Sequence, residues 1–175
     1  LSGSYEKIVI TRPAVSTDED IGFLPGTLED KMLPWMLPIY DVFHKFVTPN
    51  VVKNMITKGR IEICPLAFMR GRTFDNTFII ADEMQNSTPN QMLMILTRIG
   101  ENSKMVITGD TTQVDLPSQT LSGLRVIQDI LKDVEDICFM NLTSEDVVRN
   151  RLVGEIVDAY GRWDTDNGNR NLKRI

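Results

Sequence analysis

Residues 78–86 read Phe78-Ile79-Ile80-Ala81-Asp82-Glu83-Met84-Gln85-Asn86, a short apolar strand that ends in two adjacent carboxylates. The pattern returns at Met105-Val106-Ile107-Thr108-Gly109-Asp110, with Gln113 just beyond. Two apolar strands that deliver acidic and amide side chains to one sheet edge are the layout of a nucleoside triphosphatase site. In such a site Asp82 can hold a hydrated magnesium ion and Glu83 can polarise the attacking water, while the second strand senses the terminal phosphate.

Around this stretch, apolar runs of strand length alternate with segments of helical periodicity. Thr88 can cap the next helix, with Pro89 at its first position and Gln91 completing a capping box. The proline-rich segment 14–40 predicts only short helical turns. Because nearly continuous apolar strands are typical of buried parallel sheets, we predict an α/β fold with a mostly parallel sheet and helices on both faces. Strands are expected at 7–11, 60–65, 77–82, 104–109 and 137–141, and further helices within 42–58, at 121–134 and after residue 143.

The composition is that of one globular domain. Of the 175 residues, 42% are hydrophobic and 25% charged, which allows a sizeable core. We place the domain at residues 1–162 and a polar tail at 163–175. The net charge of −5 excludes a chain-wide attraction to nucleic acid, so such a contact must be a local patch. No apolar run reaches membrane-spanning length and the start has no signal-peptide pattern, so we expect a cytoplasmic protein without a membrane partner.

Four arginines are candidate contacts for phosphate or nucleic acid. Arg70 and Arg72 stand in one loop, where they can be solvated surface residues or can bind phosphate and the RNA or DNA backbone. Arg149 can form a local ion pair with the acids that precede it, or it can serve as an arginine finger for a neighbouring subunit's nucleotide. Arg12, which follows the first expected strand, leaves similar alternatives open.

Together these blocks resemble the PhoH-like ATPases, a family named for induction under phosphate starvation and akin to the ATPase domain of superfamily 1 helicases. The combination of Met69-Arg70-Gly71-Arg72-Thr73 with Thr108-Gly109-Asp110-Thr111-Thr112-Gln113-Val114-Asp115-Leu116-Pro117 is highly specific. The resemblance covers most of the chain and fades after Tyr160. Other matching blocks stand in the family's order at residues 10–15, 22–26, 65–68, 82–86 and 143–149.

The resemblance implies a P-loop core of the RecA and helicase type. Asp82 corresponds to the Walker B residue for magnesium and Glu83 to the catalytic carboxylate, while Asp110 and Gln113 resemble the helicase-type motif that reads the γ-phosphate. The family's Walker A block, GxxxxGK[ST], is missing from the 175 residues. We therefore expect an N-terminally truncated domain that lacks its first strand and P-loop and is inactive by itself.

The expected function is ATP binding and Mg²⁺-dependent ATP hydrolysis, coupled to remodelling of RNA or DNA. Arg12, Arg70 and Arg72 are the candidates for binding single-stranded nucleic acid. By resemblance the subunits form a homo-oligomer, a hexameric ring in which Arg149 acts in trans. One rival is a non-hydrolysing nucleic-acid-binding or scaffolding module without the phosphate cradle. Another is a kinase-like phosphotransferase, against which the Thr108–Gln113 block argues.

Overall fold

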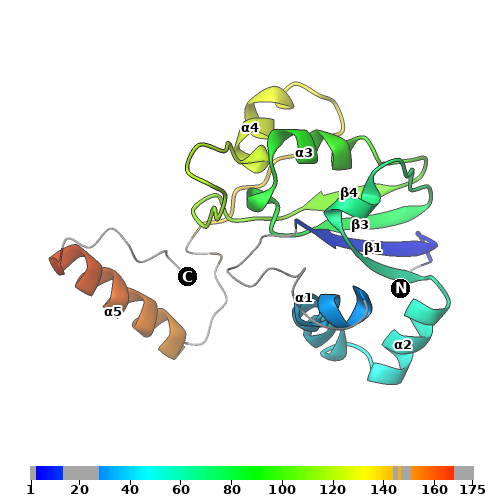
Figure 1. The fold of residues 1–175 in the computed structure, drawn as a ribbon, viewed down its shortest axis with the longest axis horizontal. Helices are drawn as coiled ribbons and strands as arrows, with labels where there is room; N and C mark the ends of the chain where they lie inside the picture. Colours follow the sequence, from blue (N-terminus) through cyan, green and yellow to red (C-terminus); the bar gives the residue numbers. More distant parts are fainter. Residues whose placement is uncertain (1–2, 14–27, 144–145, 147–150, 168–175) are drawn as a thin grey trace. The chain divides into compact units, whose positions relative to one another are not determined.

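The fold comes from a computed structural model of the chain, which describes residues 3–13, 28–143, 146 and 151–167. The chain divides into two compact units, Leu1–Ile127 and Gln128–Ile175. The first unit holds a four-stranded sheet (Figure 1). It carries most of the residues that the sequence singles out for function, so it is described first.

All four strands run parallel, in the spatial order β2-β1-β3-β4. Thr11 lies opposite Ala81, and Ala81 opposite Ile107, so β1, β3 and β4 end at the same level. The predicted α/β class with a parallel sheet is therefore confirmed. The strands span Lys7–Arg12 (β1), Ile61–Pro65 (β2), Thr77–Ala81 (β3) and Lys104–Ile107 (β4).

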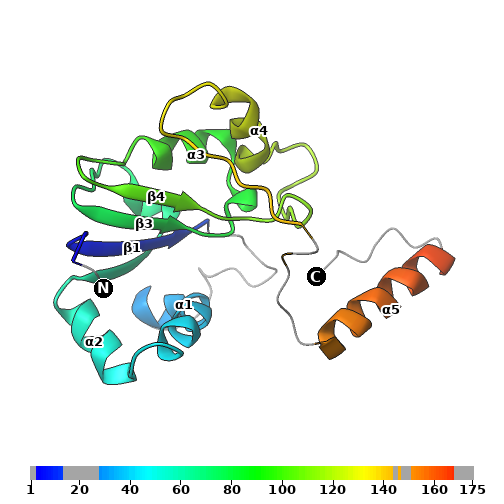
Figure 2. The same cartoon turned by 180° about the vertical axis from the view of Figure 1, so that it is seen from behind.

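Helices flank both faces of this sheet. The chain moves from β1 to β2 in one direction and from β3 to β4 in the other. Because crossovers between parallel strands are right-handed, these two connections lie on opposite faces. Figures 1 and 2 show α1 and α2 on one side and α3 on the other. These helices span Leu28–His44 (α1), Pro49–Thr57 (α2) and Pro89–Leu96 (α3).

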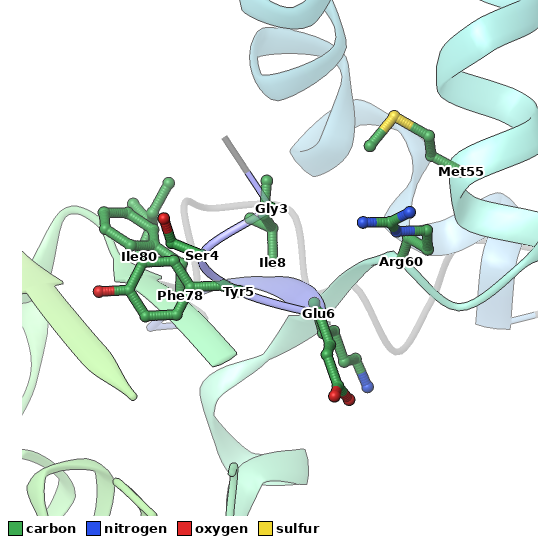
Figure 3. A pocket seen from close by; sticks show the side chains of 10 residues that line it. Gly3, Ser4, Tyr5, Glu6, Ile8, Met55, Arg60, Phe78 and Ile80 are labelled. Atoms are coloured by element: carbon green, nitrogen blue, oxygen red, sulfur yellow. The ribbon is translucent and has the colours of Figure 1, made fainter. Parts of the chain in front are cut away.

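The two faces of the sheet are buried to different degrees. Ile8 and Phe78 are register partners, and they line a cavity of about 320 Å³ together with Met55 of α2 (Figure 3). Val9 and Ile79, the next residues along these strands, point to the opposite face and are fully buried. On the α3 side, other fully buried side chains include Met84, Met92 and Ile95, while Val52 of α2 and Ile61, the register partner of Ile8, are buried on the other side.

Helix α1 corrects the expectation of short turns before residue 40. It is continuous over Leu28–His44 and passes through Pro34 and Pro38, while residues 14–27 lie outside the described part of the chain. Proline removes a backbone donor and crowds the carbonyl four residues earlier, which is why the sequence weighs against a helix here. Burial of Ile39 in tertiary packing opposes that local penalty.

Helix α3 begins as predicted. The Thr88 side chain accepts a hydrogen bond from the Gln91 N–H at 3.3 Å, and the Gln91 side chain accepts one from the Thr88 N–H at 2.8 Å. This capping box satisfies two donors that a helix start leaves unpaired. Two short 3₁₀ helices, Leu66–Met69 (η2) and Met84–Asn86 (η3), follow β2 and β3.

The prediction of a strand at 137–141 is wrong. These residues form no strand, and their apolar side chains are exposed, with Met140 at 82%. A strand needs a neighbour to complete its hydrogen-bond ladder, and in the sheet that the structure describes, none of these residues pairs with β4. Helix α4 is also shorter than predicted, covering Gly123–Ile130.

Helix α5 spans Arg151–Asn167 and so crosses the domain boundary expected at residue 162. It carries the predicted apolar stripe at helical spacing, and the members of this stripe are exposed, with Leu152 at 60% and Tyr160 at 61%. Among the described residues, no helix combines the length and hydropathy that crossing a membrane requires.

Candidate active site

The predicted acidic residues lie at the carboxyl ends of β3 and β4, beside the end of β1. Strand order reverses around β1, and in open parallel sheets ligands bind outside the carboxyl ends of strands at such a switch point. Asp82 directly follows β3, and its N–H donates to the Thr11 carbonyl of β1 at 2.9 Å. The sequence therefore places its acids where this class of sheet binds ligands.

Asp82 is held from two sides. Its Oδ2 accepts hydrogen bonds from Arg12 Nε at 2.9 Å and Arg12 Nη2 at 2.7 Å. Its Oδ1 accepts one from Thr108 Oγ1 at 2.6 Å. Arg12 ends β1 and Thr108 follows β4, so the carboxylate joins all three strand ends. Two charge-assisted hydrogen bonds to the same oxygen fix the orientation of the carboxylate.

Glu83 has a different environment from its neighbour. Its backbone is left-handed, with φ 55° and ψ 33°, a conformation that is uncommon for a residue with a side chain. Its Oε2 accepts a hydrogen bond from Gln85 Nε2 at 2.6 Å, and its side chain remains 47% exposed. The backbone turn therefore presents a held but accessible carboxylate. Unusual backbone of this kind persists where the surroundings over-determine it, often at functional sites.

Gln85 connects Glu83 with the loop after β4, and sequence reasoning assigned it no role. The residue is 1% exposed, and its Oε1 accepts from the Asp110 N–H at 3.2 Å. Its Nε2 also donates to the Gln113 carbonyl at 3.3 Å. One buried amide thus bridges both parts of the predicted site. The only signal for it was its place inside the run that follows β3.

Asp110 and Gln113 lie together in that loop, as their spacing predicted. Asp110 Oδ2 accepts from Gln113 Nε2 at 2.9 Å, and Oδ1 accepts from the Thr112 N–H at 2.8 Å. Asn86 of η3 steadies the far end, because its Oδ1 accepts from the Asp115 N–H at 2.7 Å. The loop after β4 is therefore fixed by the residues that follow β3.

The donor set at Asp82 fits a magnesium ion shared with phosphate. Among the described residues, no group of three His, Cys, Asp or Glu side chains could hold a metal ion. Magnesium in nucleotide sites uses one or two carboxylates and completes its shell with water and substrate phosphates. The carboxylate of Asp82 beside the hydroxyl of Thr108 supplies oxygen donors of this kind, and it needs phosphate oxygens to complete a site.

The three arginines proposed for nucleic acid have different surroundings. Arg12 is paired with Asp82, as described above. Arg72 forms a fork with Glu62, with Nη2 to Oε2 at 2.9 Å, and its guanidinium lies 4.6 Å from the ring centre of Phe74. Arg70 is exposed after η2. The structure thus engages two of the three with different carboxylates, and their role with nucleic acid stays a prediction.

Glu62 is the centre of a separate ionic cluster on β2. Lys7 of β1 and Arg72 both contact its carboxylate. Hydrogen bonding from Arg72 is the main cause that lowers the pKa of Glu62 from 4.5 to about 2; Lys7 adds to the effect and partial burial opposes it. The cluster ties the loop that carries Arg72 to the sheet. Its evident role is to stabilise that loop.

Arg149 and Glu145 lie outside the described residues. Asp146 is described, and it accepts hydrogen bonds from the Thr143 N–H at 2.7 Å and from Thr143 Oγ1 at 3.1 Å. These hydrogen bonds join Thr143, which the sequence assigned to the start of a helix, to the third residue after it. The role of Arg149 stays a prediction.

Comparison with known proteins gives a consistent result. The family model described as PhoH-like protein matches residues 1–161. A PhoH-like protein of Mycobacterium tuberculosis is 52% identical over 158 residues, which cover 90% of this chain and 45% of the relative. One from Synechocystis is 50% identical over 162 residues, covering 93% and 49%. Protein PhoH of Escherichia coli is 40% identical over 157 residues, covering 89% and 44%. The chain spans about half the length of the curated relatives it matches.

Proposed function

Because the chain belongs to the PhoH-like protein family, we propose that its first unit forms part of a nucleotide site that hydrolyses ATP with magnesium. The observation that carries the proposal is the pair Asp82 and Glu83 at the switch point of the sheet. Asp82 accepts hydrogen bonds from Arg12 and Thr108, whereas Glu83 accepts one from Gln85, has the Arg12 guanidinium only at 3.7 Å and keeps a side chain that is 47% exposed. Two neighbouring carboxylates in such different surroundings are suited to two different roles.

In this proposal Asp82 would hold the magnesium ion, which when bound neutralises charge on the phosphate oxygens. Glu83 would accept a proton from the attacking water, since its oxygens are accessible and one of them is oriented by Gln85. Asp110 and Gln113 would contact the terminal phosphate from the loop after β4. Because Gln85 touches both groups, a displacement of that loop would reach the Glu83 carboxylate through one side chain.

Substitution of Glu83 tests the reaction. No GxxxxGK[ST] segment stands in the 175 residues, so hydrolysis is measured on this chain extended to include a phosphate-binding loop of that kind. Glu83→Gln should leave nucleotide affinity near the wild-type value and lower turnover by roughly two orders of magnitude or more, the scale on which a positioned general base acts. The 175-residue chain should show weak nucleotide affinity and no hydrolysis.

Glu101→Gln is the matched control, because it makes the same change at an exposed position just before β4, at the opposite end of the sheet. It should leave turnover unchanged. Wild-type turnover by Glu83→Gln would show that another group is the base. Hydrolysis that continues at the same rate in excess EDTA would contradict the proposed requirement for magnesium.

We further propose that hydrolysis is coupled to single-stranded RNA or DNA, with Arg70 as an accessible contact. Arg70→Gln should weaken binding similarly for all sequences and reduce the salt dependence by about one counterion. Arg72→Gln is the comparison, because Arg72 is already bound to Glu62. This substitution should lower the stability of the protein, whereas Arg70→Gln should change nucleic-acid binding alone. Unchanged affinity and salt slope in Arg70→Gln would place the nucleic-acid contact elsewhere.

A further inference from the structure

Arg12 occupies the carboxylate that the proposed function assigns to magnesium. Two of its nitrogens bind the same oxygen, Asp82 Oδ2, at 2.9 and 2.7 Å. The other oxygen is bound by Thr108. Both oxygens of Asp82 therefore already have a partner, and one partner, the Arg12 guanidinium, carries a full positive charge.

The Arg12–Asp82 ion pair is partly buried and held in a defined geometry. The Arg12 side chain is 20% exposed and that of Asp82 is 33% exposed, so water screens the pair only partly. The backbone also fixes the position of the pair, because the carbonyl of Thr11, the residue before Arg12 in β1, accepts a hydrogen bond from the Asp82 N–H. Glu83 Oε1 lies 3.7 Å from Arg12 Nη2, which makes it the nearest second acceptor for this guanidinium.

A divalent cation and this guanidinium are competitors for Asp82. A cation on Oδ2, directly or through one water, would lie within a few ångströms of the Arg12 charge, and repulsion at that distance is large in a partly buried site. The ion gains the carboxylate fully only if the fork with Arg12 opens. The chain offers the released guanidinium a place nearby, at Glu83 or at the phosphate groups of a bound nucleotide.

We propose that Arg12 is a competing counter-ion that holds Asp82 when no metal ion is bound and releases it when a divalent cation binds. The inference rests on the proposed role of Asp82 toward magnesium, and it adds a control on when that role becomes available. Arg12 keeps the two adjacent carboxylates neutralised and correctly placed in the empty site, at the cost of weaker metal binding.

The test measures metal binding on the nucleotide-free 175-residue chain, with Mn²⁺ as the probe and water proton relaxation as the readout. Arg12→Gln should bind Mn²⁺ about tenfold more tightly than the wild type, because one repelling charge is removed from the site. Arg60→Gln is the charge-matched control, since Arg60 lies just before β2 at the amino end of the strands, and it should bind like the wild type. Asp82→Asn should weaken binding.

A second measurement needs no variant of the site. In the wild-type chain, the Arg12 Nε–H signal in NMR should shift and lose protection from solvent exchange as Mg²⁺ is added. The Nε–H signal of Arg72, whose Nη1 and Nη2 bind Glu62 away from the site, should not change. This readout decides the matter even if Arg12→Gln fails to fold.

The outcomes separate the two proposals. If Asp82→Asn weakens Mn²⁺ binding but Arg12→Gln binds no more tightly than the wild type, Arg12 and the metal share Asp82 and the counter-ion inference is overturned alone. An Arg12 signal that does not respond at saturating Mg²⁺ overturns it in the same way. If Asp82→Asn binds Mn²⁺ as well as the wild type, the ion is elsewhere, and both the inference and the proposed role of Asp82 fail.

Discussion

Because of Glu62, the free energy of unfolding of this protein should depend on pH in the acidic range. Its pKa is lowered from 4.5 in the unfolded chain to about 2, chiefly by the hydrogen bond from Arg72. A depressed pKa contributes stability that is fully present above the unfolded value and is lost as pH falls from about 4.5 toward 2. Because the carboxylate is partly exposed, we expect about 1–2 kcal/mol from this source.

Urea unfolding of the wild type and of Glu62→Gln between pH 7 and pH 2.5 measures this contribution. The difference in unfolding free energy should be largest near neutral pH and should shrink below pH 4.5. Glu101→Gln, which removes an exposed carboxylate, serves as the control. A difference that stays constant over the whole range would mean that Glu62 acts through packing and not through its charge.

At the residue scale, the sequence predicted where the acids of the candidate site lie but not which groups hold them. Asp82, Glu83, Asp110 and Gln113 could be found because strand ends in a parallel sheet meet at one edge, and the structure brings them together there. The partner of Asp82 could not be found in this way. Arg12 is 70 residues away, and its contact depends on the register between β1 and β3, which apolar periodicity leaves open.

At the scale of elements, Gly109 should be required for the loop after β4 to meet the residues after β3. A Cβ added at Gly109 would lie 2.6 Å from Gln85 Oε1 and 2.7 Å from Leu124 Cδ2, with the Gln85 backbone nitrogen at 3.0 Å. The Gln85 side chain is 1% exposed and hydrogen-bonded to the Asp110 N–H, and its backbone nitrogen belongs to η3, so Gln85 cannot move away freely. Gly109→Ala should lower the unfolding free energy by about 1–3 kcal/mol, the usual cost of overpacking.

Gly154→Ala is the matched control, because a Cβ at Gly154 meets nothing within 4 Å and the residue lies inside α5. Alanine should stabilise that helix by ~0.5–1 kcal/mol relative to glycine. Thermal unfolding followed by circular dichroism compares the two variants. Equal stability of Gly109→Ala and the wild type would mean that the loop can move away from Gln85 without cost.

The elements themselves were predictable to the extent that local chemistry decides them. The four strands of the sheet and the capping box of α3 follow from apolar runs and from Thr88, Pro89 and Gln91. Helix α1 did not follow, because its two prolines oppose a helix locally and tertiary packing decides the outcome. The strand predicted at 137–141 is absent because local β propensity favours a strand but cannot supply the neighbouring strand that it must pair with.

At the scale of the whole molecule, the proposal that remains is assembly into a ring with Arg149 acting on a neighbour's nucleotide. In the proposed site the carboxylates would supply negative charge and a base, whereas phosphoryl transfer also gains from a cation placed on the transferred group. Arg12 is engaged with Asp82 while the site is empty, and if metal binding releases it, Arg12 is one candidate for that cation. An arginine from a second subunit of a cyclic homo-oligomer would meet the need.

Mixing two inactive variants of the extended protein tests this proposal. Glu83→Gln subunits keep Arg149, and Arg149→Ala subunits keep Glu83, so an interface between them can combine one intact residue of each kind. With equal amounts and random exchange, about a quarter of the interfaces in a ring do so, and roughly that share of wild-type turnover should return. Each variant alone and the double variant mixed with wild type at matched ratios are the controls, with mixed oligomers verified by native mass spectrometry. Mixed oligomers without recovered turnover, or a monomer fully active at nanomolar concentration, would show that Arg149 is a local salt-bridge residue or a finger that acts within its own subunit.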